Sequence, residues 1–271
     1  MPKMKTIALA MTLAGVLSAP ALAGGEYSQY GDLRYPLVSV SGIEVSKGSW
    51  ESYSGAYYAF NRDFDSDGVI FRVLGLAGAY DHSFAGVNVD SDYWQGDVMI
   101  GYQWVRGGFD FSVMVGAEYQ KHRGTIIDPG LVILPGPATV LRGSNDEFGF
   151  KVAADLESNW RSNSPIYTAL MGSYSTAFDT YHALGRIGYD FGPFTFGPEV
   201  WAFGDEAGDA QRLGGFLKFD RELGTTASVL TVSAGYQFGE DNRWAQYQDG
   251  AYATLQFRMA FGESRGAAPM K

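Results

Sequence analysis

Acidic and basic side chains recur at alternate positions along this chain, and they are the residues whose types and spacing could bind ions or do chemistry. The alternation predicts one inward-facing set: Arg72, Asp97, Glu118, Lys151, Asp155, Glu157, Arg186, Asp190, Glu199, Arg212, Lys218 and Arg258. Inside a barrel, mixed charges can pair across the lumen and close it, or line a narrow aqueous path. We favour pairing because buried charges need partners, although the spacing does not assign each acid to a base.

Three histidines offer a second kind of chemistry near the ends of predicted strands. They are His82, His122 and His182, with Asp81, Ser83 and Asp179 close by in the sequence. These residue types could supply the acid, base and nucleophile of an outer-membrane hydrolase. Polar residues gather wherever strands leave a membrane, however, and the sequence has no phosphate-binding glycine loop, zinc-ligand spacing or nucleophile elbow. It therefore predicts no catalytic, cofactor-binding or metal-binding residue.

The strand that best shows how such side chains are positioned runs from Tyr93 to Trp104. Its alternate residues are apolar on one face and mostly polar on the other, with Trp94 and Trp104 at the two ends of the apolar face. At roughly 3.3 Å per residue and a tilt near 40°, the strand spans about 25 Å, the height of the apolar band of an outer-membrane barrel. We predict that Trp94, Trp104, Tyr119 and Phe261 lie in aromatic girdles at the membrane surfaces.

Twelve segments have this pattern or a weaker form of it. They are approximately residues 37–46, 51–61, 68–81, 91–104, 108–121, 145–160, 164–177, 180–191, 194–203, 208–220, 226–238 and 248–261. Most are about ten residues or longer, whereas strands of soluble proteins average about five or six. We therefore predict an all-β fold: a transmembrane up-and-down antiparallel β-barrel of about twelve strands over residues 37–261, with ten or fourteen strands as alternatives.

The connections between these segments alternate in length, as expected for a barrel with short turns at one end and long loops at the other. The short connections are 62–67, 105–107, 161–163, 192–193 and 221–225, and the long ones are 82–90, 122–144 and 239–247. All of the connections with even positions in the order are short, and the three long ones have odd positions. This parity predicts an even number of strands.

Two of the long connections carry groups that could meet a partner. The fifth contains Asp128-Pro129-Gly130 followed by the mainly apolar run 131–137. We expect that run to fold into the barrel mouth, touch the membrane surface or bind another protein, unless it only packs on its neighbours. Trp244 and Tyr247 in the eleventh connection could stack on a sugar ring, but a girdle position is the favoured interpretation.

The first 23 residues have the three parts of a secretory signal peptide: a basic start, a short apolar stretch and an Ala-x-Ala site ending at Ala23. We predict cleavage near Ala23, a periplasmic lead-in over 24–36, a polar tail over 262–271 and localisation in the bacterial outer membrane. The net charge of −10 argues against nucleic-acid binding, which needs a basic surface. Cysteine is absent, so a closed barrel rather than disulfides would hold the secreted chain together.

The last predicted strand ends at Phe261, and apolar or aromatic residues occupy every second position before it. This pattern resembles the C-terminal signal that outer-membrane barrels present to the barrel assembly machinery, although here the polar tail follows. We therefore expect the assembly machinery and outer-membrane lipid as partners.

Several short motifs occur in an order that resembles a known family. They are Gly42-Ile-Glu44, Gly68-Val-Ile-Phe-Arg72, Gly78-Ala-Tyr80, Gln95-Gly96, Gly101-Tyr-Gln103, Asp128-Pro129, Gly197-Pro-Glu-Val200 and Gly204-Asp205. With them the chain resembles the cellulose biosynthesis protein BcsS family of alphaproteobacteria. The resemblance implies a non-enzymatic outer-membrane component of cellulose production or secretion, with cellulose or cellulose-secretion proteins as partners.

Three functions remain after these arguments: an accessory barrel in cellulose biosynthesis or secretion, a porin-like channel for small solutes, and an outer-membrane hydrolase with histidines at its rim. A twelve-strand barrel with a charge-paired lumen is narrow for a glucan chain. The accessory role is therefore the favoured hypothesis.

Overall fold

Nearly all of the described part of the chain is β-strand. The computed structural model describes residues 33–84, 87–128, 139–158, 164–206, 208–223, 225–239 and 248–264. The strands are β1 (Leu33–Ser46), β2 (Ser49–Ala59), β3 (Gly68–Phe84), β4 (Val87–Arg106), β5 (Phe109–Asp128), β6 (Thr139–Ser158), β7 (Ile166–Ser175), β8 (Tyr181–Phe191), β9 (Phe194–Asp205), β10 (Gly208–Leu223), β11 (Thr226–Gly239) and β12 (Gly250–Ser264). A short 3₁₀ helix, η1 (Ala177–Asp179), lies between β7 and β8. No helix in these residues is long and apolar enough to cross a membrane.

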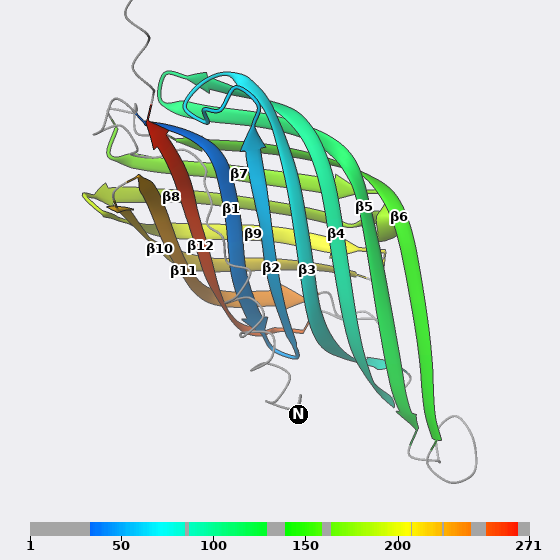
Figure 1. Cartoon of the computed structure of the whole chain (residues 1–271). Helices are drawn as coiled ribbons and strands as arrows, with labels where there is room; N and C mark the ends of the chain where they lie inside the picture. Colours follow the sequence, from blue (N-terminus) through cyan, green and yellow to red (C-terminus); the bar gives the residue numbers. More distant parts are fainter. Residues whose placement is uncertain are drawn as a thin grey trace, which may run out of the picture.

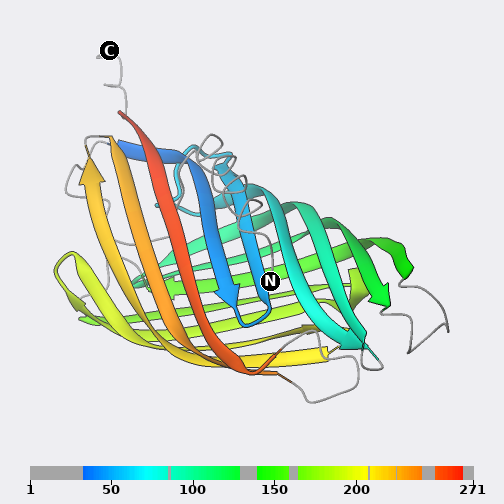
Figure 2. The ribbon, with the colours of Figure 1, turned by 90° about the horizontal axis from the view of Figure 1, so that it is seen from below.

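The twelve strands form one closed sheet in which each pairs with its neighbours in sequence, and β1 also pairs with β12. Val40, for example, lies opposite Gly55 of β2 and opposite Arg258 of β12. Figure 2 shows β1 and β12 side by side at this closure. All of the strand pairs are antiparallel, so the predicted up-and-down barrel of twelve strands and the even strand count are confirmed.

The two ends of the barrel differ. Leu33 at the start of β1 lies opposite Ser264 near the end of β12, and we call this the terminal end and the other the far end. Strands β3 to β6 are the longest, with 17 residues in β3 and 20 in each of the others, and they project past the remaining strands (Figure 1). β7 has only 10 residues.

Several predicted boundaries are wrong because the strands extend into stretches where hydrophobic alternation stops. The predicted loop 82–90 is a continuation of β3 and β4, which pair as far as Phe84 opposite Val87. Most of the predicted connection 122–144 is likewise strand, since β5 runs to Asp128 and β6 starts at Thr139. At the terminal end, β1 takes up the last residues of the predicted lead-in 24–36 and β12 the first residues of the predicted tail 262–271.

The barrel has an apolar outer face and a mixed inner face, as the alternation predicted. In β4, Val98 and Ile100 are both 50% exposed, whereas Asp97 and Met99, which alternate with them, are almost fully buried. A transmembrane barrel needs this arrangement because its outer residues contact lipid and its inner residues contact one another. At the terminal end, the interior is an apolar core that includes Val38, Met114 and Ala260.

Candidate functional site: the charge-lined barrel interior

The central cluster of the interior joins two bases to two acids from β3 to β6. Arg72 donates to both carboxylate oxygens of Asp97, at 3.1 and 2.8 Å. Lys151 lies 3.0 Å from Asp97 and also contacts the carboxylate of Glu118. The Gln120 amide donates to the second oxygen of Glu118 at 2.7 Å. All of these side chains are buried, so each charge is neutralised within the protein.

A second cluster surrounds the buried carboxylate of Glu199 on β9. Arg186 donates to it at 2.8 Å, and the hydroxyls of Ser233 and Tyr252 donate at 2.9 Å each. Arg186 also lies over the ring of Phe216, 5.3 Å from its centroid. Strands β8, β9, β11 and β12 are thereby connected through one carboxylate.

Arg212 on β10 connects the same half of the barrel to β1. Its guanidinium lies 2.5 Å from a carboxylate oxygen of Glu44 and donates to Gln237 at 2.9 Å. The guanidinium also lies over the rings of Phe203 and Tyr252, at 4.5 and 4.9 Å from their centroids. These ring contacts add to the ion pair, because an aromatic face attracts a cation.

The third cluster crosses the lumen. Arg258 on β12 donates to Glu157 on β6 at 2.9 Å, and these strands lie on opposite sides of a twelve-strand ring. The other oxygen of Glu157 accepts a hydrogen bond from Tyr167 at 2.6 Å. Lys218 lies over the Tyr167 ring at 4.8 Å and pairs with Asp220 at 2.9 Å. The ion pair between Arg258 and Glu157 spans the lumen from wall to wall.

Asp155 and Asp190, also predicted to face inward, meet hydroxyl groups. Ser112 donates to Asp155 at 3.4 Å, and Thr195 donates to Asp190 at 2.5 Å. The structure thus brings the twelve residues of the predicted inward set into three ion-paired clusters, the Arg212 site and these two hydroxyl contacts.

The connection between β2 and β3, predicted as a simple short turn, folds back into the terminal end of the barrel. Phe64 at its middle is buried in the apolar core. Its amide donates to the carbonyl of Tyr35 at 3.2 Å, and its carbonyl accepts from the Gln103 side chain at 2.5 Å. We call residues 60–67 the inner loop. It lies at the same end of the barrel as the third cluster and borders the same cavity.

Asp67 fixes the end of the inner loop to the start of the next turn. Its carboxylate accepts hydrogen bonds from the Arg106 guanidinium at 2.6 Å and from the Val105 amide at 2.9 Å. Both donors favour the ionised form, so they lower the pKa of Asp67, and the Arg106 bond contributes most. A lowered pKa stabilises the fold above the unfolded-state pKa, and this contribution is lost as the pH falls through the folded-state pKa.

We expect Arg106→Gln to raise the pKa of the Asp67 carboxyl, because the strongest donor to its ionised form is removed. The titration of that carboxyl, followed by NMR in detergent micelles, measures the change. Substituting Arg123, an exposed arginine on the projecting part of β5, by Gln should leave the titration unchanged. An unchanged pKa in Arg106→Gln would mean that the contact does not hold the loop in solution.

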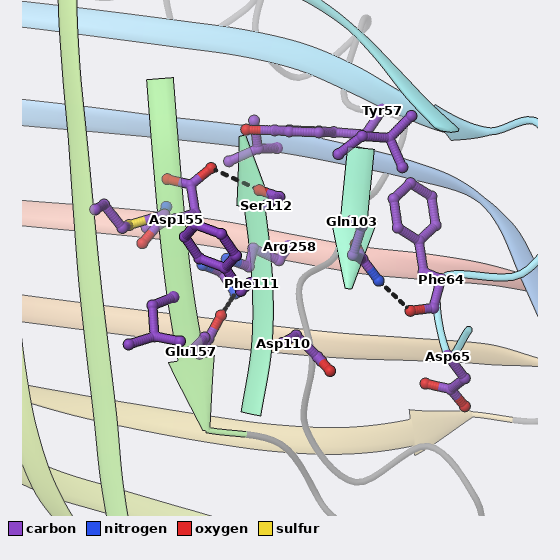
Figure 3. A pocket seen from close by; sticks show the side chains of 15 residues that line it. Tyr57, Phe64, Asp65, Gln103, Asp110, Phe111, Ser112, Asp155, Glu157 and Arg258 are labelled. Atoms are coloured by element: carbon purple, nitrogen blue, oxygen red, sulfur yellow. Dashed lines mark hydrogen bonds and ion pairs between the residues drawn. The ribbon is translucent and has the colours of Figure 1, made fainter. Parts of the chain in front are cut away.

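A cavity of about 80 Å³ lies between the inner loop and the third cluster. Figure 3 shows Gln103 and Phe64 on one side of it and Asp155, Glu157 and Arg258 on another. Apolar side chains complete its wall. A volume of this size holds roughly five water molecules, so this part of the interior contains a small chamber with both polar and apolar side chains in its wall.

In the part of the chain that the structure describes, the histidines lie among aromatic side chains. The His122 ring stacks on Tyr93 at 5.3 Å, and its Nδ1 lies 3.2 Å from the Tyr80 hydroxyl. His182 meets the edge of Trp201 at 4.9 Å. Neither ring hydrogen-bonds to a carboxylate or a serine hydroxyl in the described residues, and the side chain of His82 lies outside them. No group of three His, Asp or Glu side chains in the described part of the chain could hold a metal ion.

The residues predicted for the girdles lie on the outer face. Trp94 packs on Tyr119 at 5.0 Å towards the far end, and Trp104 packs on Tyr102 at 4.9 Å and Phe111 at 5.5 Å towards the terminal end. Phe261 on the outer face of β12 is partly exposed. The apolar run 131–137, Trp244, Tyr247 and the predicted signal peptide 1–23 lie outside the described residues.

Sequence reasoning missed several partners of the predicted charges. They are Glu44, Tyr167, Ser233, Gln237 and Tyr252. The alternation itself could have placed Tyr252 and Gln237 inward. Tyr252 has the same parity in its strand as the predicted charge Arg258, and Gln237 lies directly opposite the predicted charge Arg212 across the sheet. The sequence also contains an indication that Phe64 is buried, because it is an aromatic residue between two aspartates in a predicted turn.

A closed antiparallel barrel with an apolar outer face and a charge-paired interior defines the class of transmembrane β-barrel proteins. Within this class, the chain belongs to the family of the cellulose biosynthesis protein BcsS, whose model matches residues 38–261. The resemblance noted from the motifs is thereby confirmed. No curated protein matches the chain.

Among solved structures, the chain is similar to two autotransporter domains. The β domain of the Bordetella autotransporter BrkA has 11% identity and a TM-score of 0.48, over 84% of this chain and 98% of that one. The transport unit of AIDA-I from Escherichia coli has 9% identity and a TM-score of 0.44, over 94% of this chain and 97% of that one.

Proposed function

We propose that the protein is a non-enzymatic accessory barrel of the outer membrane that takes part in cellulose biosynthesis or secretion without conducting the polymer. Family membership supports the link to cellulose. The observation that carries the accessory role is the ion pair between Glu157 and Arg258 across the lumen. In this proposal, the pair and the inner loop fill the lumen and leave no passage for a glucan chain.

In this proposal, the terminal end faces the periplasm and the projecting strands β3 to β6 reach the cell surface. A signal peptide cleaved near Ala23 delivers the chain, and the barrel assembly machinery inserts it into outer-membrane lipid. The partners are cellulose itself or the proteins that secrete it. The inward charges listed above then act as a structural filling of the lumen, while Trp94, Trp104, Tyr119 and Phe261 act as membrane girdles.

Two measurements test the proposal together. Deletion of the gene should reduce the yield or surface attachment of cellulose, and the wild-type gene should restore it. The purified protein in planar lipid bilayers should give no steady conductance. A stable conductance that changes with Arg258→Met would support the porin-like alternative instead, and normal cellulose in the deletion strain would contradict the link to the polymer.

A further inference from the structure

Among the strand pairs in the described part of the chain, β6 and β7 form the shortest joint. In the described residues, β6 and β7 pair only from Lys151 opposite Ser175 to Glu157 opposite Ala169, which is seven pairs. By contrast, β5 and β6 form twenty pairs and β3 and β4 form seventeen. Beyond Lys151, β6 continues without β7 and contacts the segment that follows β7. Phe150 forms hydrogen bonds of 2.9 Å with Thr176, and the Glu147 carboxylate accepts one of 2.9 Å from the Phe178 amide. Opening this joint would therefore break fewer strand pairs than opening any other joint in the described residues.

An apolar groove of about 700 Å³ lies on the outside of this joint. Its floor is a row of small, outward-facing residues that lie directly opposite one another on β6 to β9: Ala154, Gly172, Ala183 and Ala202. The row towards the terminal end carries the larger side chains of Leu156, Leu170 and Val200. The groove thus faces the hydrocarbon of the membrane between the aromatic girdles.

The chamber shown in Figure 3, whose lining mixes polar and apolar side chains, lies on the inside of the same joint. Phe111, Asp155, Leu156 and Met171 border both the chamber and the groove. Asp155 and Met171 lie directly opposite each other in the pairing of β6 with β7. Only the wall of this short joint therefore separates an apolar space in contact with lipid from a hydrogen-bonding space inside the barrel.

We propose that the β6–β7 joint is a lateral binding site for a single-chain amphiphile, with the acyl chain in the outer groove and a small uncharged polar head in the inner chamber. The chamber has room for roughly five water molecules, which suits a head of about the size of glycerol. Its lining includes Asp110, Asp155 and Glu157, whereas its one arginine, Arg258, is paired with Glu157. An anionic head is therefore excluded by charge repulsion.

An acyl chain suits the groove because an unfilled void on the lipid-facing side of the barrel is unfavourable. Apolar concavities lose contacts unless atoms fill them, and a flexible acyl chain is the one apolar molecule that surrounds a barrel in the membrane. Gly172 and Gly185 leave room for it, since a Cβ at Gly172 would meet nothing closer than 3.8 Å and one at Gly185 nothing closer than 3.4 Å.

Binding can be measured with two matched lipids, 1-monopalmitoylglycerol and its 3-phosphate. The folded full-length protein in phosphatidylcholine vesicles is loaded with either radiolabelled lipid, extracted into a zwitterionic detergent and passed through gel filtration. We expect about one monopalmitoylglycerol per protein and at least tenfold less of the phosphate. Ala183→Phe fills the groove floor and should reduce retention at least tenfold, whereas Ala77→Phe, on the outer face of β3, should not. Equal retention of both lipids, or unchanged retention in Ala183→Phe, would overturn the site.

Opening of the joint is tested with a disulfide, because the chain has no cysteine of its own. Ala154→Cys with Gly172→Cys joins β6 to β7, and Gly75→Cys with Gly96→Cys joins β3 to β4 at an equally direct pair. Oxidation of the first pair should slow lipid uptake at least tenfold, and reduction should restore it. Oxidation of the second pair should have no effect. Equal uptake by the oxidised and reduced forms of the first pair would contradict lateral entry. Folding is checked in each case by heat-modifiable migration on gels.

Discussion

Replacing Lys151 by Met is expected to lower the free energy of unfolding by about 3–5 kcal/mol. Among the described residues, Lys151 is the only base that contacts Glu118, and it shares Asp97 with Arg72. Its side chain is 9% exposed and those of both acids are fully buried, so water cannot replace it. The variant leaves the Glu118 carboxylate with amide donors only. Urea titration of the protein in micelles, followed by tryptophan fluorescence, measures the loss.

Two companion variants separate the unpaired charge from other effects. Lys121→Met removes a pair with Asp146 that is partly exposed at 3.2 Å, and pairs of this kind contribute less than about 1 kcal/mol. Lys151→Met combined with Glu118→Gln removes both charges and should recover most of the lost stability. If Lys151→Met alone unfolds within about 1 kcal/mol of wild type, then the central cluster does not hold the walls together.

The sequence was sufficient to predict the barrel because hydrophobic alternation directly reports contact with lipid. Between Trp94 and Trp104, one face of the strand contacts lipid and the other faces the barrel interior. The hydrophobic alternation therefore covers the same residues as the strand. Beyond the girdle, residues 142–147 of β6 are exposed on both faces. The alternation ends there, while the strand pairing continues to Phe84 and Asp128. This is why residues 82–90 were predicted to be a loop. The inner loop was missed for the opposite reason, since its burial depends on Phe64 meeting residues from several distant strands.

The direction of the interior charges was predictable, but their partners were not. Parity alone places Glu157 and Arg258 on the inner face. Their contact, however, depends on the number of strands, the stagger between neighbours and the curvature that brings β6 opposite β12. None of these is encoded locally. The neutral partners of the clusters, such as Ser233 and Tyr252, were missed because a hydroxyl has no charge to indicate its role.

Replacing Gly197 by Ala is expected to destabilise the barrel by about 3 kcal/mol or more, or to prevent folding. Gly197 lies on the inner face of β9, where a Cβ would overlap the carbonyl oxygen of Ile187 and approach the Gly188 Cα to 2.7 Å. Both are backbone atoms of β8, so no side chain can move aside. A Cβ at Gly188 would in turn meet Phe216 at 2.8 Å. The pair of glycines lets β8 and β9 approach closely beneath the ring that Arg186 covers. The fraction that migrates as folded protein on unheated gels, followed by urea titration, measures the effect.

The matched control is Gly75→Ala, a glycine on the outer face of β3. Its backbone is also extended, but the nearest atom to an added Cβ is 3.9 Å away. Here the methyl group costs nothing in the folded state and restricts the unfolded chain, so stability should rise by up to about 1 kcal/mol. Opposite signs for the same substitution would show that glycine in this barrel acts through close strand contact at Gly197 and not through flexibility. If both variants behave alike, the close approach of β8 and β9 is not a feature of the folded protein.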